Sequence, residues 1–147
     1  MIVLDSNILL RYANTSDPLY PVVDAAITRL RADGEILCIV AQNLYEFWAA
    51  ATRPVSANGL GMSIAEADTQ KTRLKRLFRL LPDDPRLLDE WESLVFLYAC
   101  HGRVSYDARI VAAMNTHGVT EILTFNAPDF RRFAGLTISD PRSFVVP

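Results

Sequence analysis

Residues 1–7 read MIVLDSN, and the apolar run at 2–4 ends directly on the carboxylate of Asp5. A short run without polar alternation is typical of a strand covered on both faces, as in a parallel sheet. Nothing in such a buried strand requires a charge at its end. The opening of the chain therefore predicts the first strand of a parallel sheet and singles out Asp5 for explanation.

A second strand is predicted at residues 35–41, EILCIVA, where β-branched residues again stand in a nearly continuous apolar run. Between the two strands, apolar residues recur at helical spacing from Leu19 to Leu30, and Gly34 ends that pattern. A strand, a helix and another strand in this order most simply form a right-handed parallel βαβ unit.

The remainder of the chain continues this alternation. Helices are predicted at 42–54 with Asn43 as the cap, at 63–77 with a capping box of Ser63 and Glu66, from Asp84 and Pro85 onward, and at 105–118 with Ser105 as the cap. Further strands are predicted at 78–82, 120–125 and 136–139, with a short helix following residue 126. The pattern predicts one α/β domain over residues 1–147, with a mainly parallel sheet of roughly five strands.

Composition limits the classes of protein that this chain can be. Its 147 residues are 50% hydrophobic and 22% charged, which predicts a folded domain with a genuine core. The formal net charge of −2 excludes a global basic field, so any contact with nucleic acid must come from a local patch. The two cysteines lack metal-ligand spacing, and there is no long apolar segment. We expect a cytoplasmic protein with no membrane contact.

Four carboxylates are candidates for a common site, namely Asp5, Glu46, Asp107 and Asp129, and three of the four lie just beyond a predicted strand or at a helix start close to one. In open parallel sheets, the reactive crevice lies outside the carboxyl ends of the strands. If these side chains meet there, their mutual repulsion requires a cation, and hard oxygen ligands suit Mg²⁺ or Mn²⁺.

Each carboxylate also has a purely structural interpretation. Glu46 stands three residues after Asn43, which fits the acid of a capping box. Asp107 and Asp129 occupy positions where an acid stabilises a helix N-terminus through the helix dipole. The joint pattern of four acids carries more weight than any single member.

Four segments in this order, IVLDSNILL at 2–10, NLYEFW at 43–48, YDARIVAAM at 106–114 and ILTFNAPDF at 122–130, resemble those of the PIN-domain nucleases. Within that family the chain looks most like the VapC-like toxins of bacterial toxin–antitoxin systems. The resemblance implies a three-layer α/β/α fold and a ribonuclease that depends on Mg²⁺ or Mn²⁺. It also implies a cognate antitoxin protein and a homodimer.

The resemblance also assigns roles to residues. Asp5 matches the first acid of the family, Glu46 the second and Asp107 the third, and Asn7 matches the polar residue that orients the first acid. Many members place an aspartate directly after the fourth strand, where this chain has Asn126.

This departure leaves two interpretations of the fourth acidic position of the site. Either Asp129 completes an acidic quartet, or Asn126 supplies a neutral oxygen to a site with three carboxylates. For contacts with RNA phosphates, Arg53 and Arg109 are the first candidates, because both stand close to acidic motifs.

Three other functions remain open at this point. A phosphatase of the haloacid-dehalogenase type requires a second aspartate where this chain has Asn7, and a phosphoacceptor receiver domain requires a lysine after a late strand. A non-catalytic module that binds RNA or an antitoxin is motivated by Asn126. The binding of Mg²⁺ or Mn²⁺ distinguishes an enzyme from such a module.

Overall fold

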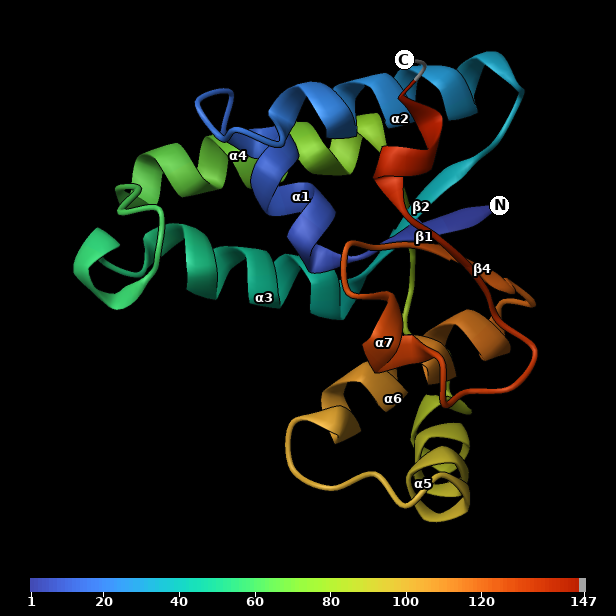
Figure 1. Cartoon of the computed structure of the whole chain (residues 1–147). Helices are drawn as coiled ribbons and strands as arrows, with labels where there is room; N and C mark the ends of the chain where they lie inside the picture. Colours follow the sequence, from blue (N-terminus) through green and yellow to red (C-terminus); the bar gives the residue numbers. More distant parts are fainter. Residues whose placement is uncertain (146–147) are drawn as a thin grey trace.

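A computed structural model of the chain describes residues 1–145 and contains a five-stranded, wholly parallel sheet (Figure 1). The strands lie in the order β3-β2-β1-β4-β5, which confirms the predicted parallel α/β architecture. The elements are β1 (Ile2–Leu4), α1 (Ser6–Ala13), α2 (Tyr20–Ala32), β2 (Leu37–Val40), α3 (Ala41–Thr52), η1 (Val55–Ala57), α4 (Ile64–Leu77), β3 (Arg79–Leu81), α5 (Leu87–Leu97), α6 (Val104–Thr116), β4 (Glu121–Leu123), α7 (Ala127–Phe130), β5 (Thr137–Ser139) and η2 (Pro141–Phe144).

The sheet separates two hydrophobic cores, so the fold has three layers. Alternate residues of the central strand face opposite layers: Ile2 and Leu4 pack against α1 to α4, and Val3 packs against α5 and α6. Figure 1 shows α1, α2 and α4 on one side of the sheet and α5 and α6 on the other. Within the described part of the chain, no helix combines the length and apolarity needed to cross a bilayer.

Helix α1 is an element that the sequence patterns did not predict. It begins directly after Asp5, whose side chain accepts a hydrogen bond from the Ser6 amide and whose carbonyl accepts one from Ile8. Ile8, Leu9 and Tyr12 are buried on one face of this short helix. The missed signal was Asp5 itself, because an aspartate followed by apolar residues at helical spacing is an N-cap.

Three residues predicted as helix caps, Asn43, Asp84 and Ser105, do not occupy the cap position. Helix α3 begins at Ala41, so Asn43 lies inside its first turn, where its side-chain oxygen accepts from the Val40 amide. Asp84 instead binds Arg86, and α5 starts only at Leu87.

Ser105 likewise lies inside its helix, because α6 begins at Val104, and the Ser105 hydroxyl donates to the Gly102 carbonyl. In contrast, the capping box of Ser63 and Glu66 is confirmed, and α4 ends at Leu77 as predicted.

Phe47 provides a test of the core beneath α3. Its side chain is 0% exposed, whereas Tyr45 on the same helix is 64% exposed. We expect Phe47→Ala to lower the free energy of unfolding by about 3–5 kcal/mol, because it removes a buried ring and leaves a cavity. Tyr45→Ala, the matched control, should change it by about 0.5 kcal/mol or less. Urea denaturation of both variants measures the difference, and equal losses would contradict the packing described here.

Candidate functional site

The carboxyl edge of the sheet carries a cleft of about 660 Å³ that contains all four predicted carboxylates. Asp5 comes from the end of β1, Glu46 from α3, Asp107 from α6 and Asp129 from α7. Asn7 and Asn126 line the same cleft. Residues separated by more than 120 positions are therefore brought together by the parallel order of the strands.

Asp5 is the most deeply placed of these acids, with 7% of its surface exposed. Its backbone amide donates to the Leu123 carbonyl at 3.0 Å, which ties the end of β1 to β4. Its carboxylate accepts from the Ser6 amide and the Thr124 hydroxyl, both at 2.6 Å. These contacts hold the carboxylate in one orientation at the end of the central strand.

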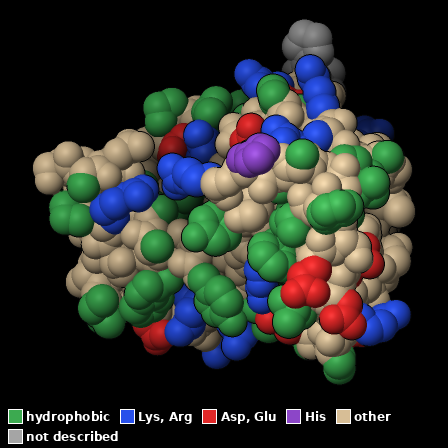
Figure 2. All heavy atoms as spheres, turned by 90° about the horizontal axis from the view of Figure 1, so that it is seen from below, with side chains coloured by type: hydrophobic (Ala, Val, Ile, Leu, Met, Phe, Trp, Pro, Cys, Tyr) green, Lys and Arg blue, Asp and Glu red, His purple; other side chains and the backbone are tan. Residues whose placement is uncertain are grey.

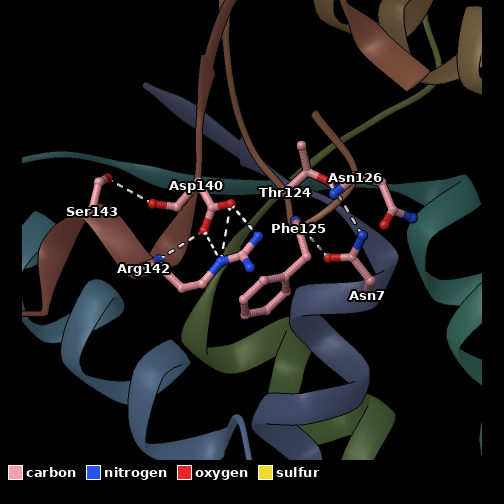
Figure 3. Close-up of polar contacts among 7 residues, drawn as sticks. All are labelled: Asn7, Thr124, Phe125, Asn126, Asp140, Arg142 and Ser143. Atoms are coloured by element: carbon pink, nitrogen blue, oxygen red, sulfur yellow. Dashed lines mark hydrogen bonds and ion pairs between the residues drawn. The ribbon is translucent and has the colours of Figure 1, made fainter. Parts of the chain in front are cut away.

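Asn7 is hydrogen-bonded to Asp5 and to the residues that follow β4. Its side-chain Nδ2 donates to Asp5 Oδ2 at 2.7 Å and to Thr124 Oγ1 at 3.1 Å. Its Oδ1 accepts from the Phe125 amide at 3.3 Å. Figure 3 shows Asn7 pointing at the loop that follows β4, where the Asn126 amide donates to Thr124 Oγ1.

This loop is anchored through the ring of Phe125. The guanidinium carbons of Arg11 and Arg142 lie 4.9 and 5.6 Å from the ring centroid. Figure 3 shows that Arg142 is itself held by Asp140. The distance from Arg142 Nη2 to Asp140 Oδ2 is 2.6 Å. The C-terminal η2 segment therefore helps to fix the loop that carries Thr124 and Asn126.

Glu46 lies in the second turn of α3, where both of its carboxylate oxygens have donors. Oε1 accepts from Gln42 Nε2 at 2.6 Å, and Oε2 accepts from the Ser6 hydroxyl. The capping-box interpretation of Glu46 is wrong, since its carboxylate accepts from the side chains of Gln42 and Ser6, and the N-cap amide of α3 is bound by Asn43 instead.

Asp107 is half-buried in the first turn of α6, and its pKa is raised from 3.8 to about 7. Burial is the largest cause, followed by repulsion from Asp129, Asp5 and Glu46, while Arg132 lowers the value. The four carboxylates therefore interact electrostatically across the cleft.

Burial likewise raises the pKa of Asp5, from 3.8 to about 6. The hydrogen bonds from Thr124 and Ser6 oppose this shift because they favour the charged form, and repulsion from Glu46 and Asp129 adds to it. The cleft thus brings together carboxylates whose ionised forms repel one another.

The donor set of the cleft fits a hard divalent cation. Within residues 1–145, no three His, Cys, Asp or Glu side chains stand close enough to form a ready-made cage. Mg²⁺ does not require such a cage, because it retains several waters and is typically bound through one or two carboxylates and substrate phosphates. Asp5, Glu46, Asp107 and Asp129 supply suitable oxygens, and Asn126 adds a neutral one.

The two predicted arginines occupy different places. Arg53 is exposed and lines the cleft, with its Nη2 donating to the Asn58 carbonyl at 3.2 Å. Arg109 lies outside the cleft, because its guanidinium is held by Asp83 at 2.8 Å and lines a neighbouring cavity. Arg103, which the sequence patterns did not single out, lines the cleft together with Arg53.

Sequence patterns also missed the residues that hold the acids, namely Ser6, Gln42 and Thr124. Each had a weak signal: Ser6 follows Asp5 directly, Gln42 precedes Glu46 by one helical turn, and Thr124 is the last residue but one of a predicted strand. None of these signals names a partner, since Ser6 and Thr124 bind residues 40 and 119 positions away.

Known proteins resemble this chain along most of its length. Ribonuclease VapC24 of Mycobacterium tuberculosis is 29% identical over 146 residues, covering 96% of this chain and 97% of the relative. The structure of VapBC2 from Rickettsia felis, bound to a promoter DNA fragment, superposes with a TM-score of 0.69 at 13% identity, covering 95% of this chain and 98% of that one.

A second solved structure has the same fold. VapC20 of Mycobacterium tuberculosis, a sarcin-ricin loop cleaving toxin, superposes with a TM-score of 0.61 at 16% identity over 83% of this chain and 87% of that one. The family defined by the PIN domain matches residues 2–136, which include all four carboxylates. On this match, the chain belongs to the PIN-domain family.

Proposed function

We propose that this protein is a Mg²⁺- or Mn²⁺-dependent endoribonuclease and the toxin of a VapBC-type toxin–antitoxin pair, formed by one domain over residues 1–147. The observation that carries the proposal is the convergence of Asp5, Glu46, Asp107 and Asp129 in one cleft of a PIN domain. The similarity to a protein named as a ribonuclease supports RNA as the substrate.

Different residues of the cleft would bind the cation, orient its ligands and contact the RNA phosphate. Asp5, Glu46 and Asp107 would hold the cation, with Asp5 fixed by Asn7 and Thr124. When bound, the metal would supply positive charge for the phosphate and lower the pKa of a water for attack on phosphorus. Arg53 lies in the cleft, where its guanidinium can contact an RNA phosphate.

A haloacid-dehalogenase type of phosphatase is disfavoured by the side chain at position 7. Asn7 donates its amide hydrogens to Asp5 and Thr124, and an amide cannot act as the general acid that this reaction requires. For the partner, the solved VapBC2 complex supports an antitoxin protein that binds this chain. A homodimer remains part of the proposal.

Carboxylate-to-amide substitutions test the catalytic assignment. We expect Asp5→Asn and Asp107→Asn each to lower cleavage of single-stranded RNA by about 100-fold or more, because each removes a charge that holds the cation at the reacting centre. Cleavage of a fluorescent RNA with Mg²⁺ or Mn²⁺, and with EDTA, measures the loss. Glu92→Gln, on the exposed side of α5, is the matched control and should cleave normally. Undiminished cleavage by the aspartate variants would remove the mechanism.

A second pair of variants distinguishes Asp129 from Asn126 as the residue at the fourth position of the acidic site. If Asp129 completes the site, Asp129→Asn should weaken Mn²⁺ binding by roughly tenfold, because a carboxylate ligand contributes charge that an amide does not. Asn126→Ala should then have a smaller effect. Calorimetric titration of Mn²⁺ measures both affinities. A larger loss of affinity in Asn126→Ala than in Asp129→Asn would assign the fourth position to Asn126.

Metal binding should depend on pH in the range set by the two raised pKa values. Below about pH 6 to 7, Asp107 and then Asp5 carry protons that a cation must displace. We therefore expect the Mn²⁺ affinity to rise from pH 5.5 to pH 8, with proton release at pH 6.5 that disappears near pH 8.5. Calorimetry in buffers of different ionisation enthalpy counts the protons, and a flat profile would contradict the coupling.

Burial of the ionised Asp107 and its repulsion by the other acids should cost stability when no metal is present. The pKa of Asp107 is higher in the folded chain than in the unfolded one, so its stabilising contribution is complete below about pH 4 and is lost as the pH rises through 7. Asp107→Asn should therefore raise the melting temperature at pH 8 by about 2–4 °C, which corresponds to roughly 1 kcal/mol. Glu92→Gln should leave it unchanged, and a lower melting temperature for Asp107→Asn would reject this account.

A further inference from the structure

A second cavity, of about 440 Å³, lies between the N-terminal ends of α5 and α6 and takes no part in holding the carboxylates. Its wall is mainly apolar and includes Pro85, Leu88, Trp91 and Tyr106. Figure 2 views the molecule from the side on which α5 and α6 lie in Figure 1, and hydrophobic side chains gather on that face. A volume of this size and an apolar wall are typical of small-molecule sites.

Two aromatic rings line this cavity, one held in place by a hydrogen bond and the other exposed to solvent. Trp91 is half-buried, and its Nε1 donates to the Ser105 carbonyl at 2.8 Å, which holds the indole in place. Tyr106 is 61% exposed and is free of the core. Leu88, at 60% exposure, adds apolar surface beside them. A fixed indole and an exposed phenol ring suit a flat, partly apolar ligand.

The cavity adjoins the acidic cleft. Tyr106 lines both of them, and it directly precedes Asp107 on α6. Gln42 links residues of the two spaces, since its Nε2 donates to Glu46 and to the Tyr106 carbonyl, and its Oε1 accepts from Arg109 at 3.4 Å. A ligand that spans the two spaces would place an anionic group at the carboxylates and a planar group in the cavity.

From this geometry we infer that the cavity binds one nucleobase of the RNA, beside the phosphodiester held at the acidic cleft. The inference rests on the proposed function and names a subsite for its substrate. Single-stranded RNA is recognised by unstacked bases that lie on aromatic side chains, with hydrogen bonds to the base edges. Trp91 and Tyr106 offer the stacking surfaces, and Arg109 presents N–H donors at the wall.

This subsite also gives Arg109 a different role from the phosphate contact predicted for it. Its guanidinium is fixed by Asp83 at 2.8 Å and by Gln42, so it is held away from the cleft and against the cavity. A guanidinium fixed in this way can donate to an acceptor on a base edge, which selects among bases rather than binding all phosphates equally.

Tryptophan fluorescence tests the subsite without requiring cleavage. The chain has two tryptophans, so Trp48→Phe leaves Trp91 as the only reporter. The probes are adenosine, cytidine, guanosine and uridine, which are neutral and not repelled by the acidic cleft, with ribose as the base-free control. We expect saturable quenching by at least one nucleoside and none by ribose. Absence of quenching by all four nucleosides would overturn the inference.

A matched pair of variants on α5 locates the binding site. Leu88→Asp places a carboxylate in the cavity and should weaken nucleoside binding about tenfold, within the range lost with one base–aromatic contact. Leu97→Asp, at a residue that is 70% exposed and outside the cavity wall, should bind as the parent does. Equal binding by both variants would reject the cavity as the site.

Cleavage and assembly measurements separate this inference from the proposed function. With active protein, Leu88→Asp should raise KM for single-stranded RNA with little change in kcat, because the metal site is untouched. If RNA is never cleaved, the nucleoside titration still decides whether the subsite exists. If Leu88→Asp alters sedimentation but not nucleoside binding, the cavity is a protein contact and the inference is wrong.

Discussion

The arrangement of the site depends on one constraint: a carboxylate must remain at the end of the central strand of a doubly covered sheet. Asp5 follows β1, which pairs with β2 on one side and β4 on the other, so its position is fixed by two neighbours. Its amide, its side chain and its carbonyl all have partners, and the side chain also begins α1. The same residue therefore closes a strand, caps a helix and faces the cleft.

Holding the other acids near Asp5 opposes the stability of the fold. Burial and repulsion raise the pKa values of Asp5 and Asp107, which means that their ionised forms are disfavoured in the folded chain. Hydrogen bonds from Thr124, Asn7 and Ser6 offset part of this cost at Asp5. Perturbed carboxylates grouped in a cleft are typical of functional sites, where stability is lower than packing alone would allow.

Supporting contacts extend the site well beyond the carboxylates. Gln42 joins Glu46 to the backbone of Tyr106 and to Arg109, and the ring of Phe125 is covered by arginines from α1 and the C-terminal segment. Such contacts orient the groups that touch a metal or a substrate, and they connect the acidic cleft to the neighbouring aromatic cavity. The RNA-binding surface proposed here is consequently built from both layers that flank the sheet.

The amino-acid sequence alone determined the alternation of strands and helices and the positions of the four acids along the chain. Hydrophobic runs such as residues 2–4 and 37–40 have only one stable place, between two layers, and parallel strands necessarily gather their carboxyl ends at one edge. Only the tertiary structure decided which side chains meet there. Asp5 accepts a hydrogen bond from Thr124, 119 residues away, and Arg109 is held by Asp83 instead of facing the cleft. These pairings arise from packing between distant segments, which periodicity and spacing along one chain do not encode.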